Sequence, residues 1–369
     1  MTAESLSRLQ ELARANPNDN ATQLRLVKAL MQASTTLTGS DPKARAQIAA
    51  RYNAQALQTT RNLIARNDPD AMFLLADCYG DGRMGLEPDP KEAFTLYQNA
   101  GKLGHPAAAY RTAICCEIGA EEGGGTRKDP VKAFQWYKRA ATLGDVPACY
   151  KMGIILTKGL VGQERNVAEA VVWLEKASLG ADEENPHSLH ELALLYESGA
   201  TAPVGPPQPS AAAGGAASAI VVPKDEARAL SLFTQAAKLG YKYSQFKLGQ
   251  AYEYGLLTCT INARQSIIWY TKAAAQGEHQ SELALSGWYL TGSDGILECS
   301  DTEAYLWARK AAMANPPLPK AMFAMGYFTE VGIGCPKSLD EARRWYGRAA
   351  GKFGGAPRCV SERQRLTRM

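Results

Sequence analysis

The sequence lacks any apolar run long enough to cross a membrane, because no stretch of it approaches about 18 consecutive apolar residues. Its first residues, Met1 to Arg8, include Glu4 and contain no apolar segment, so they do not resemble a secretory signal. We therefore expect a cytosolic protein without a membrane-spanning helix.

Paired cysteines are also missing. None of the eight cysteines belongs to a C-x-x-C pair, and their positions follow no regular period: 78, 115, 116, 149, 259, 299, 335 and 359. This pattern argues against a zinc site and against a disulfide ladder. Reduced thiols that pack as small apolar groups are the expected state.

Motifs of catalysis are equally scarce. There is no G-x-S-x-G elbow, and the four histidines, at positions 105, 187, 190 and 279, are too scattered along the chain to indicate a general base. His187 and His190 could share a helix face, but no further ligand cluster follows them, so packing or capping is favoured over metal binding. The sequence therefore predicts no enzyme activity, no metal and no cofactor.

The glycine-rich stretch from Glu121 to Lys128 resembles a phosphate-binding loop only in its glycines, since no strand precedes it and no G-K-[ST] follows. Turn chemistry between two helices explains this composition. A partner-binding loop is the alternative.

Charge does not indicate a nucleic-acid-binding protein. The 41 basic and 37 acidic residues are interspersed, without the positive block that nucleic acid or anionic lipid requires. The basic tail from Arg358 to Arg368 is the exception, either as a solvated terminus or as a contact with an acidic partner or a membrane surface.

A short pattern recurs seven times along the chain. An aromatic residue or leucine lies four residues before an alanine, and another small residue lies three residues before the aromatic position. Spacings of three and four place these residues on one face of a helix. The first position is Leu96, Trp136, Trp173, Leu232, Trp269, Trp307 and Trp345, and the alanine is Ala100, Ala140, Ala177, Ala236, Ala273, Ala311 and Ala349. The small residue is Ala93, Ala133, Ala170, Ala229, Ser266, Ala304 and Ala342.

A second pattern precedes the first and ends in glycine, as in Ala71, Leu75, Ala76, Tyr79 and Gly82. The glycine lies where a helix would end, because it readily adopts the left-handed conformation. Each unit is thus predicted to be a helix A, a loop and a helix B, with a period of about 38 residues. The expected fold is all-α, a right-handed α-solenoid of about seven helix-turn-helix repeats.

Three further segments interrupt or flank the repeats. Residues 1–67 do not match them and are expected to form an N-terminal helical cap, while residues 68–354 form the solenoid. Within the solenoid, residues 200–222 are rich in Pro, Ala and Gly, so neither helix nor sheet is expected there. This segment is interpreted either as a loop that tolerates insertion or as a docking motif for a proline-reading domain. Residues 355–369 form the basic C-terminal tail.

The motif A-x-x-x-L-G-x-x-Y-x-x-G followed by A-x-x-W-Y-x-K-A-A-x-x-G resembles the Sel-1-like repeat over residues 68–354. Three stretches beyond the repeat pattern, 121–126, 184–192 and 278–292, resemble the fungal chitin synthase regulatory subunits. The resemblance implies a non-catalytic activator or targeting scaffold that binds chitin synthase at the cytoplasmic face of the plasma membrane, the septum or the bud neck. The end of the sequence, Leu366 to Met369, has no prenylation box, so membrane association is expected to be indirect.

Two alternatives remain beside this interpretation. One is a generic Sel-1-like adaptor for another membrane-associated complex, such as a ubiquitin ligase or a septin-linked scaffold. The other is a secreted hydrolase of the bacterial Sel-1-like type, which would require regularly paired cysteines and export. Candidate contacts are polar or aromatic residues, expected to be exposed, that repeat packing does not require: Glu121, Glu122, Arg127, Asn185, His187, Glu191, Tyr241, Lys242, Gln245, His279 and Trp288.

Overall fold

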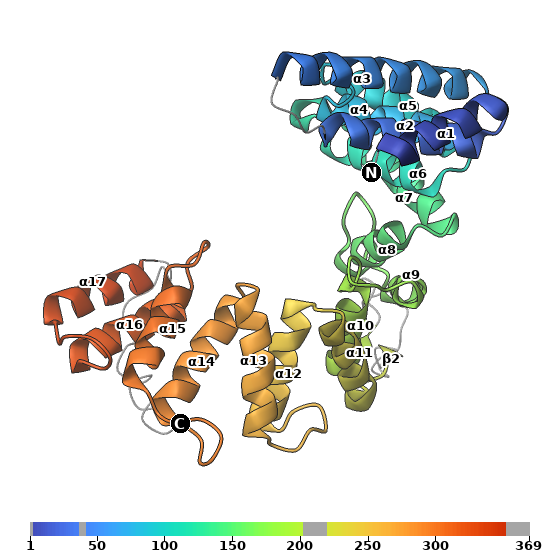
Figure 1. Cartoon of the computed structure of the whole chain (residues 1–369). Helices are drawn as coiled ribbons and strands as arrows, with labels where there is room; N and C mark the ends of the chain where they lie inside the picture. The colour runs from blue at the N-terminus through green and yellow to red at the C-terminus, as the bar shows by residue number, and fades with distance from the viewer. Residues whose placement is uncertain (1–2, 37–41, 202–219, 352–369) are drawn as a thin grey trace, which may run out of the picture. The chain divides into compact units, whose positions relative to one another are not determined.

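The computed structural model describes residues 3–36, 42–201 and 220–351, which form seventeen α-helices, one 3-10 helix and two short strands (Figure 1). The first three helices precede seven helix pairs, in which we call the earlier helix A and the later one B. The first three are α1 (Ala3–Ala15), α2 (Asn20–Thr35) and α3 (Pro42–Ala65). The A helices are α4 (Pro69–Asp81), α6 (Pro106–Ile118), α8 (Val146–Lys158), α10 (His187–Ser198), α12 (Lys242–Tyr254), α14 (His279–Thr291) and α16 (Pro319–Val331). The B helices are α5 (Pro90–Lys102), α7 (Pro130–Thr142), α9 (Val167–Leu179), α11 (Glu226–Lys238), α13 (Ala263–Ala275), α15 (Asp301–Ala312) and α17 (Leu339–Ala350).

The helices belong to two compact units. Unit 1 contains α1 to α9 and unit 2 contains α10 to α17. Within each unit, every A helix packs along its own B helix, and that B helix packs on the A helix that follows in the same unit. The predicted all-helical solenoid of repeated pairs is therefore confirmed.

Local signals explain where the helices begin and end. At α4, the Asp68 side chain accepts a hydrogen bond from the Ala71 N–H at 2.9 Å, and Pro69 occupies the first helical position. The helix ends at Gly82, whose φ of 66° lies in the left-handed region.

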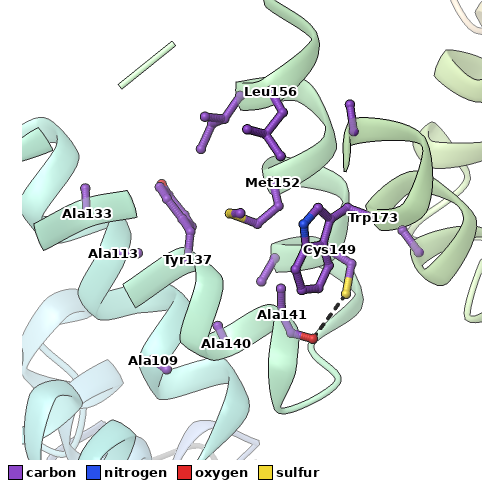
Figure 2. Close-up of a cluster of buried hydrophobic side chains, with 14 of the residues drawn as sticks. Ala109, Ala113, Ala133, Tyr137, Ala140, Ala141, Cys149, Met152, Leu156 and Trp173 are labelled. Carbon is purple, nitrogen blue, oxygen red and sulfur yellow. Dashed lines mark hydrogen bonds between the residues drawn. The ribbon is translucent and has the colours of Figure 1, made fainter. Parts of the chain in front are cut away.

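Small residues allow the helices to approach one another closely. All seven alanines of the predicted B-helix pattern are buried, and so are all seven small residues that precede them. In unit 1, Ala109, Ala113, Ala133 and Ala140 belong to the same buried cluster as the larger side chains of Tyr137, Met152 and Trp173, and Figure 2 shows this cluster. Deleting or enlarging residues in such a close-packed core costs stability.

In several of these pairs, a tyrosine of the B helix donates a hydrogen bond to a carboxylate of its A helix. The Tyr137 hydroxyl of α7 donates a hydrogen bond to the Glu117 carboxylate of α6. Lys151 of the next A helix lies 3.1 Å from the same carboxylate, so three successive helices meet at Glu117. In unit 2, Tyr270 donates to Glu253 at 2.5 Å and Tyr346 donates to Glu330 at 2.7 Å.

The two ends of the Pro, Ala and Gly-rich insert form a small antiparallel sheet, with β1 (Ala200–Thr201) paired to β2 (Ile220–Val222). The expectation that residues 200–222 contain no sheet is thus wrong at both ends. The β-branched residues of β2 favour strand geometry. Residues 202–219 and the basic tail 355–369, with the expectations attached to them, lie outside the described residues.

Candidate partner-binding surface

The predicted contact residues divide between the two units. Glu121, Glu122 and Arg127 lie in the A–B loop of the second helix pair, in unit 1, and the other eight lie in unit 2. The unit 1 and unit 2 residues are therefore considered as separate candidates.

The loop in unit 1 presents charge on a tightly packed turn. Glu121 and Glu122 end the 3-10 helix η1 (Ala120–Glu122), and both are exposed, as is Arg127. The glycines beneath them are needed for packing, because a Cβ on Gly124 would lie 2.4 Å from the Cys115 carbonyl oxygen and one on Gly125 only 1.9 Å from that of Pro90. Turn chemistry explains the glycines, and the three charged side chains remain available to a partner.

In unit 2, His187, Tyr241, Lys242 and His279 lie at the N-terminal ends of A helices, whereas Trp288 lies near the C-terminal end of α14. At α4 and α8, an aspartate caps this end through its side chain. At α10 and α12, the capping positions hold Pro186 and Tyr241, and neither makes a side-chain capping bond. These two helix ends depart from the usual cap, and aromatic side chains gather there.

We define the α10–α12 rim as His187, His190, Tyr241, Lys242 and Tyr243. The ring centroids of His187 and Tyr241 lie 5.0 Å apart, and those of His190 and Tyr241 lie 5.1 Å apart. The Tyr241 ring also meets that of Tyr243 at 5.4 Å, edge to face, and the Lys242 ammonium lies 5.3 Å from the Tyr243 ring centroid. Three predicted residues, His187, Tyr241 and Lys242, are thus brought together.

Tyr243 is the rim residue that sequence reasoning missed, although its side chain is 47% exposed. Large amphipathic rings held in place by their neighbours are common anchors in protein interfaces, and a cation above the ring adds to their binding capacity. The rim can therefore contact a protein partner through an aromatic surface with one positive charge.

His190 is the buried base of the rim. It is 8% exposed, its Nδ1 lies 2.8 Å from the Ser244 Oγ, and its ring centroid lies 5.3 Å from that of Phe233. Burial, followed by the positive charge of Lys247 and then by His187, lowers the pKa of His190 from 6.5 to about 4. The predicted packing role of this histidine is confirmed.

This pKa predicts acid sensitivity of unit 2. Between pH 6.5 and about 4 the unfolded chain binds a proton at His190 that the folded chain does not, so the free energy of unfolding falls as the pH falls. Urea unfolding at pH 7 and pH 4.5 should show that the wild type loses about 2 to 3 kcal/mol more than His190→Gln. Equal losses in both proteins would mean that His190 titrates normally.

The prediction that the Gln245 side chain is exposed is wrong, because this residue is only 4% exposed. Its Nε2 donates to the Ala237 carbonyl at 3.1 Å, and its Oε1 accepts from the Gln276 amide at 2.9 Å. The side chain therefore joins α12 to the end of α11.

The Asn185 backbone and side chain both donate to Asp182, at 2.8 and 3.0 Å, within the turn before α10, where Asn185 is half-buried. Glu191 is half-buried on α10.

The two predicted residues of α14 also take part in packing. The His279 Nδ1 lies 2.8 Å from a carboxylate oxygen of Glu282, which is fully buried, and the Lys310 ammonium lies 2.9 Å from the other oxygen. Trp288 is half-buried, and its Nε1 is buried without a hydrogen-bond partner among the described residues. The Trp288 side chain packs against the buried cluster of Tyr270, Ala274 and Leu285, so both predicted residues have a structural role within unit 2.

The described residues contain no cluster of three or more His, Cys, Asp or Glu side chains that could hold a metal ion. Seven cysteines are described, and all are free thiols. No described helix is long and apolar enough to cross a membrane.

The sequence is similar to a repeat family and to two curated fungal proteins. The family model described as Sel1 repeat matches seven segments, at residues 69–105, 106–145, 146–182, 218–241, 242–278, 279–316 and 319–352. The chain is 37% identical over 355 residues to chitin synthase regulatory factor 3 of Schizosaccharomyces pombe, covering 93% of this chain and 35% of that protein. It is 35% identical over 300 residues to the chitin synthase regulator SKT5 of Saccharomyces cerevisiae, covering 80% of this chain and 40% of that protein. The chain thus spans less than half the length of these curated relatives.

A solved structure supports the fold. The protective antigen c5321 of uropathogenic Escherichia coli, which displays an SLR fold, superposes with a TM-score of 0.56 at 24% identity, covering 94% of this chain and 79% of that chain. Six of the seven matched segments each contain one of the helix pairs described above, and the segment at residues 218–241 contains α11 without α10. The two relatives compared in sequence are chitin synthase regulators. The chain belongs to the Sel1 repeat family.

Proposed function

We propose that this chain is a non-catalytic subunit that binds chitin synthase at the cytoplasmic side of the plasma membrane or septum and promotes chitin synthesis. The observation that carries the proposal is the extent of the similarity to the Schizosaccharomyces pombe regulatory factor. The repeats match between residues 69 and 352, whereas the alignment covers 93% of the chain, so it includes residues outside the repeats. Similarity that extends beyond the repeats favours a shared role over a shared architecture alone.

Activation places a thermodynamic condition on the binding surface. The chain shifts the synthase toward its active state only if it binds that state more tightly than the inactive one, and equal affinity for both would localise the enzyme without activating it. The chemistry of chain elongation stays in the synthase.

The α10–α12 rim is the surface we assign to this contact, with the loop that carries Glu121, Glu122 and Arg127 as a second contact. The rim offers a partly exposed tyrosine held by a cluster of rings, which limits the side-chain entropy lost on binding. Septin-linked scaffold proteins are further candidate partners of the same complex.

A pull-down from detergent-solubilised membranes, read by mass spectrometry, tests the proposal. Tyr243→Ala should reduce recovery of chitin synthase about tenfold or more, as expected for an aromatic interface anchor. Tyr254→Ala is the matched control, because Tyr254 lies at the opposite end of α12 and is 50% exposed, close to the 47% of Tyr243.

Other outcomes would change the proposal. Equal recovery with both variants would exclude the rim as the contact. Recovery of ubiquitin ligase or septin components without synthase would overturn the chitin synthase assignment and favour a generic adaptor. Reversal of charge by Glu121→Lys with Glu122→Lys tests the loop in the same assay, and unchanged recovery would remove it from the contact surface.

A further inference from the structure

A half-open cavity of about 260 Å³, with polar and apolar surface in its lining, lies among α1, α2 and α3, outside the matched repeats. All three helices contribute side chains to it, together with the turns that follow α1 and α3. The lining residues are Gln10, Ala13, Arg14, Pro17, Gln23, Leu26, Gln55, Thr59, Asn62, Leu63 and Arg66.

The lining is rich in hydrogen-bond donors and carries positive charge. Two guanidinium groups and four amide side chains face it, and none of the described lining residues is acidic. Among the described residues, Arg14 makes no hydrogen bond or ion pair, so its donors are available to a ligand.

Internal contacts hold the other polar residues in place. The Arg66 Nη1 donates to the Pro17 carbonyl at 2.9 Å, which ties the end of α3 to the turn after α1. The Gln23 amide donates to the Ala13 carbonyl at 2.7 Å, and the Gln10 amide to the Gln55 side-chain oxygen at 3.4 Å. The Gln55 amide nitrogen therefore retains its own donors in the lining of the cavity.

Charge is segregated between this region and the repeats. Residues 1–67 contain nine basic and four acidic residues, a net charge of +5, whereas residues 68–351 contain 27 basic and 32 acidic residues, a net charge of −5. An anionic ligand is thus attracted to α1–α3 over the repeats.

We propose that this cavity binds the carboxylate side chains of an acidic peptide segment of a partner protein, with Arg14 as the principal contact. Arginine and amide donors match the lone pairs of a carboxylate, and a charge-assisted bidentate pair is stronger than a neutral hydrogen bond. The cavity is smaller than the roughly 300 Å³ and above that holds drug-sized ligands, so it accommodates one or two side chains. This inference goes beyond the proposed function, because it concerns α1–α3 and its test involves no synthase.

The test is fluorescence anisotropy of the 369-residue chain with a fluorescein-labelled peptide of sequence Gly-Ser-Glu-Glu-Ser-Gly, compared with the same peptide carrying two glutamines. The glutamate peptide should bind more tightly, and Arg14→Gln should weaken it about tenfold or more. Arg8→Gln is the matched control, because it removes the same charge from α1 and Arg8 does not line the cavity. It should change the affinity by less than about twofold.

Three results would overturn the proposal. Equal affinity for both peptides would show that carboxylates are not recognised. Equal effects of Arg14→Gln and Arg8→Gln on the affinity would show that the peptide is bound through general attraction by charge and not through the cavity. Binding of inorganic phosphate as tight as that of the peptide, and equally sensitive to Arg14→Gln, would assign the cavity to small free anions.

Discussion

Gly125→Ala is expected to lower the free energy of unfolding of unit 1 by about 3 kcal/mol or more. Gly125 has a φ of +68°, and a Cβ at this position would lie 1.9 Å from the Pro90 carbonyl oxygen. That oxygen belongs to the backbone at the start of α5, so no flexible side chain can move aside. The loop of one helix pair would have to separate from the first turn of the preceding B helix.

Gly85→Ala provides the control for this prediction. Gly85 also has a positive φ, +74°, but no atom beyond its chain neighbours lies within 4 Å of the position that a Cβ would take. Replacing Gly85 with alanine should lower the free energy of unfolding by about 1 to 2 kcal/mol, which is the cost of the left-handed backbone conformation alone. Urea unfolding followed by circular dichroism compares the two variants, and equal costs would show that the loop does not pack against Pro90.

Tyr137→Ala is expected to cost about 4 kcal/mol, whereas Tyr137→Phe should cost about 1 kcal/mol. The Tyr137 ring is fully buried in the core shown in Figure 2, where it packs between α6 and α8. Removal of the ring leaves a cavity, whereas removal of the hydroxyl alone leaves Glu117 with its contact to Lys151.

Hydrogen exchange read by mass spectrometry locates the effect of these variants. In repeat proteins each unit contacts its neighbours, so α6, α7 and α8 should lose protection first in Tyr137→Ala, while the helices of unit 2 keep theirs. Equal costs for the alanine and phenylalanine variants would mean that the hydroxyl, not the packed ring, provides the stability.

The helix pairs were predictable because the small residues recur at spacings of three and four, which only a helix places on one face. The burial of Gln245 was predictable in principle as well. Aligning the repeats puts Gln245 and Glu282 at the position that holds Met72, Cys149 and Met322 elsewhere, and all five are buried. The expectation that Gln245 is exposed rests on its polar side chain alone and not on this position in the repeat.

Features that depend on contacts between separate segments were not predictable from local patterns. The rim joins His187 to Tyr241 across 54 positions of the sequence, with the insert between them. The cavity among α1–α3 likewise combines residues that share no motif. Pairing of β1 with β2 depends on two short segments on either side of the insert.

Chitin synthase activity is the most direct test of the proposed function. Membranes from cells of the source organism that lack this chain should make chitin slowly, and adding the purified chain should restore the rate, with Tyr254→Ala restoring it and Tyr243→Ala failing to do so. An unchanged rate after deletion and after addition would contradict an activating role.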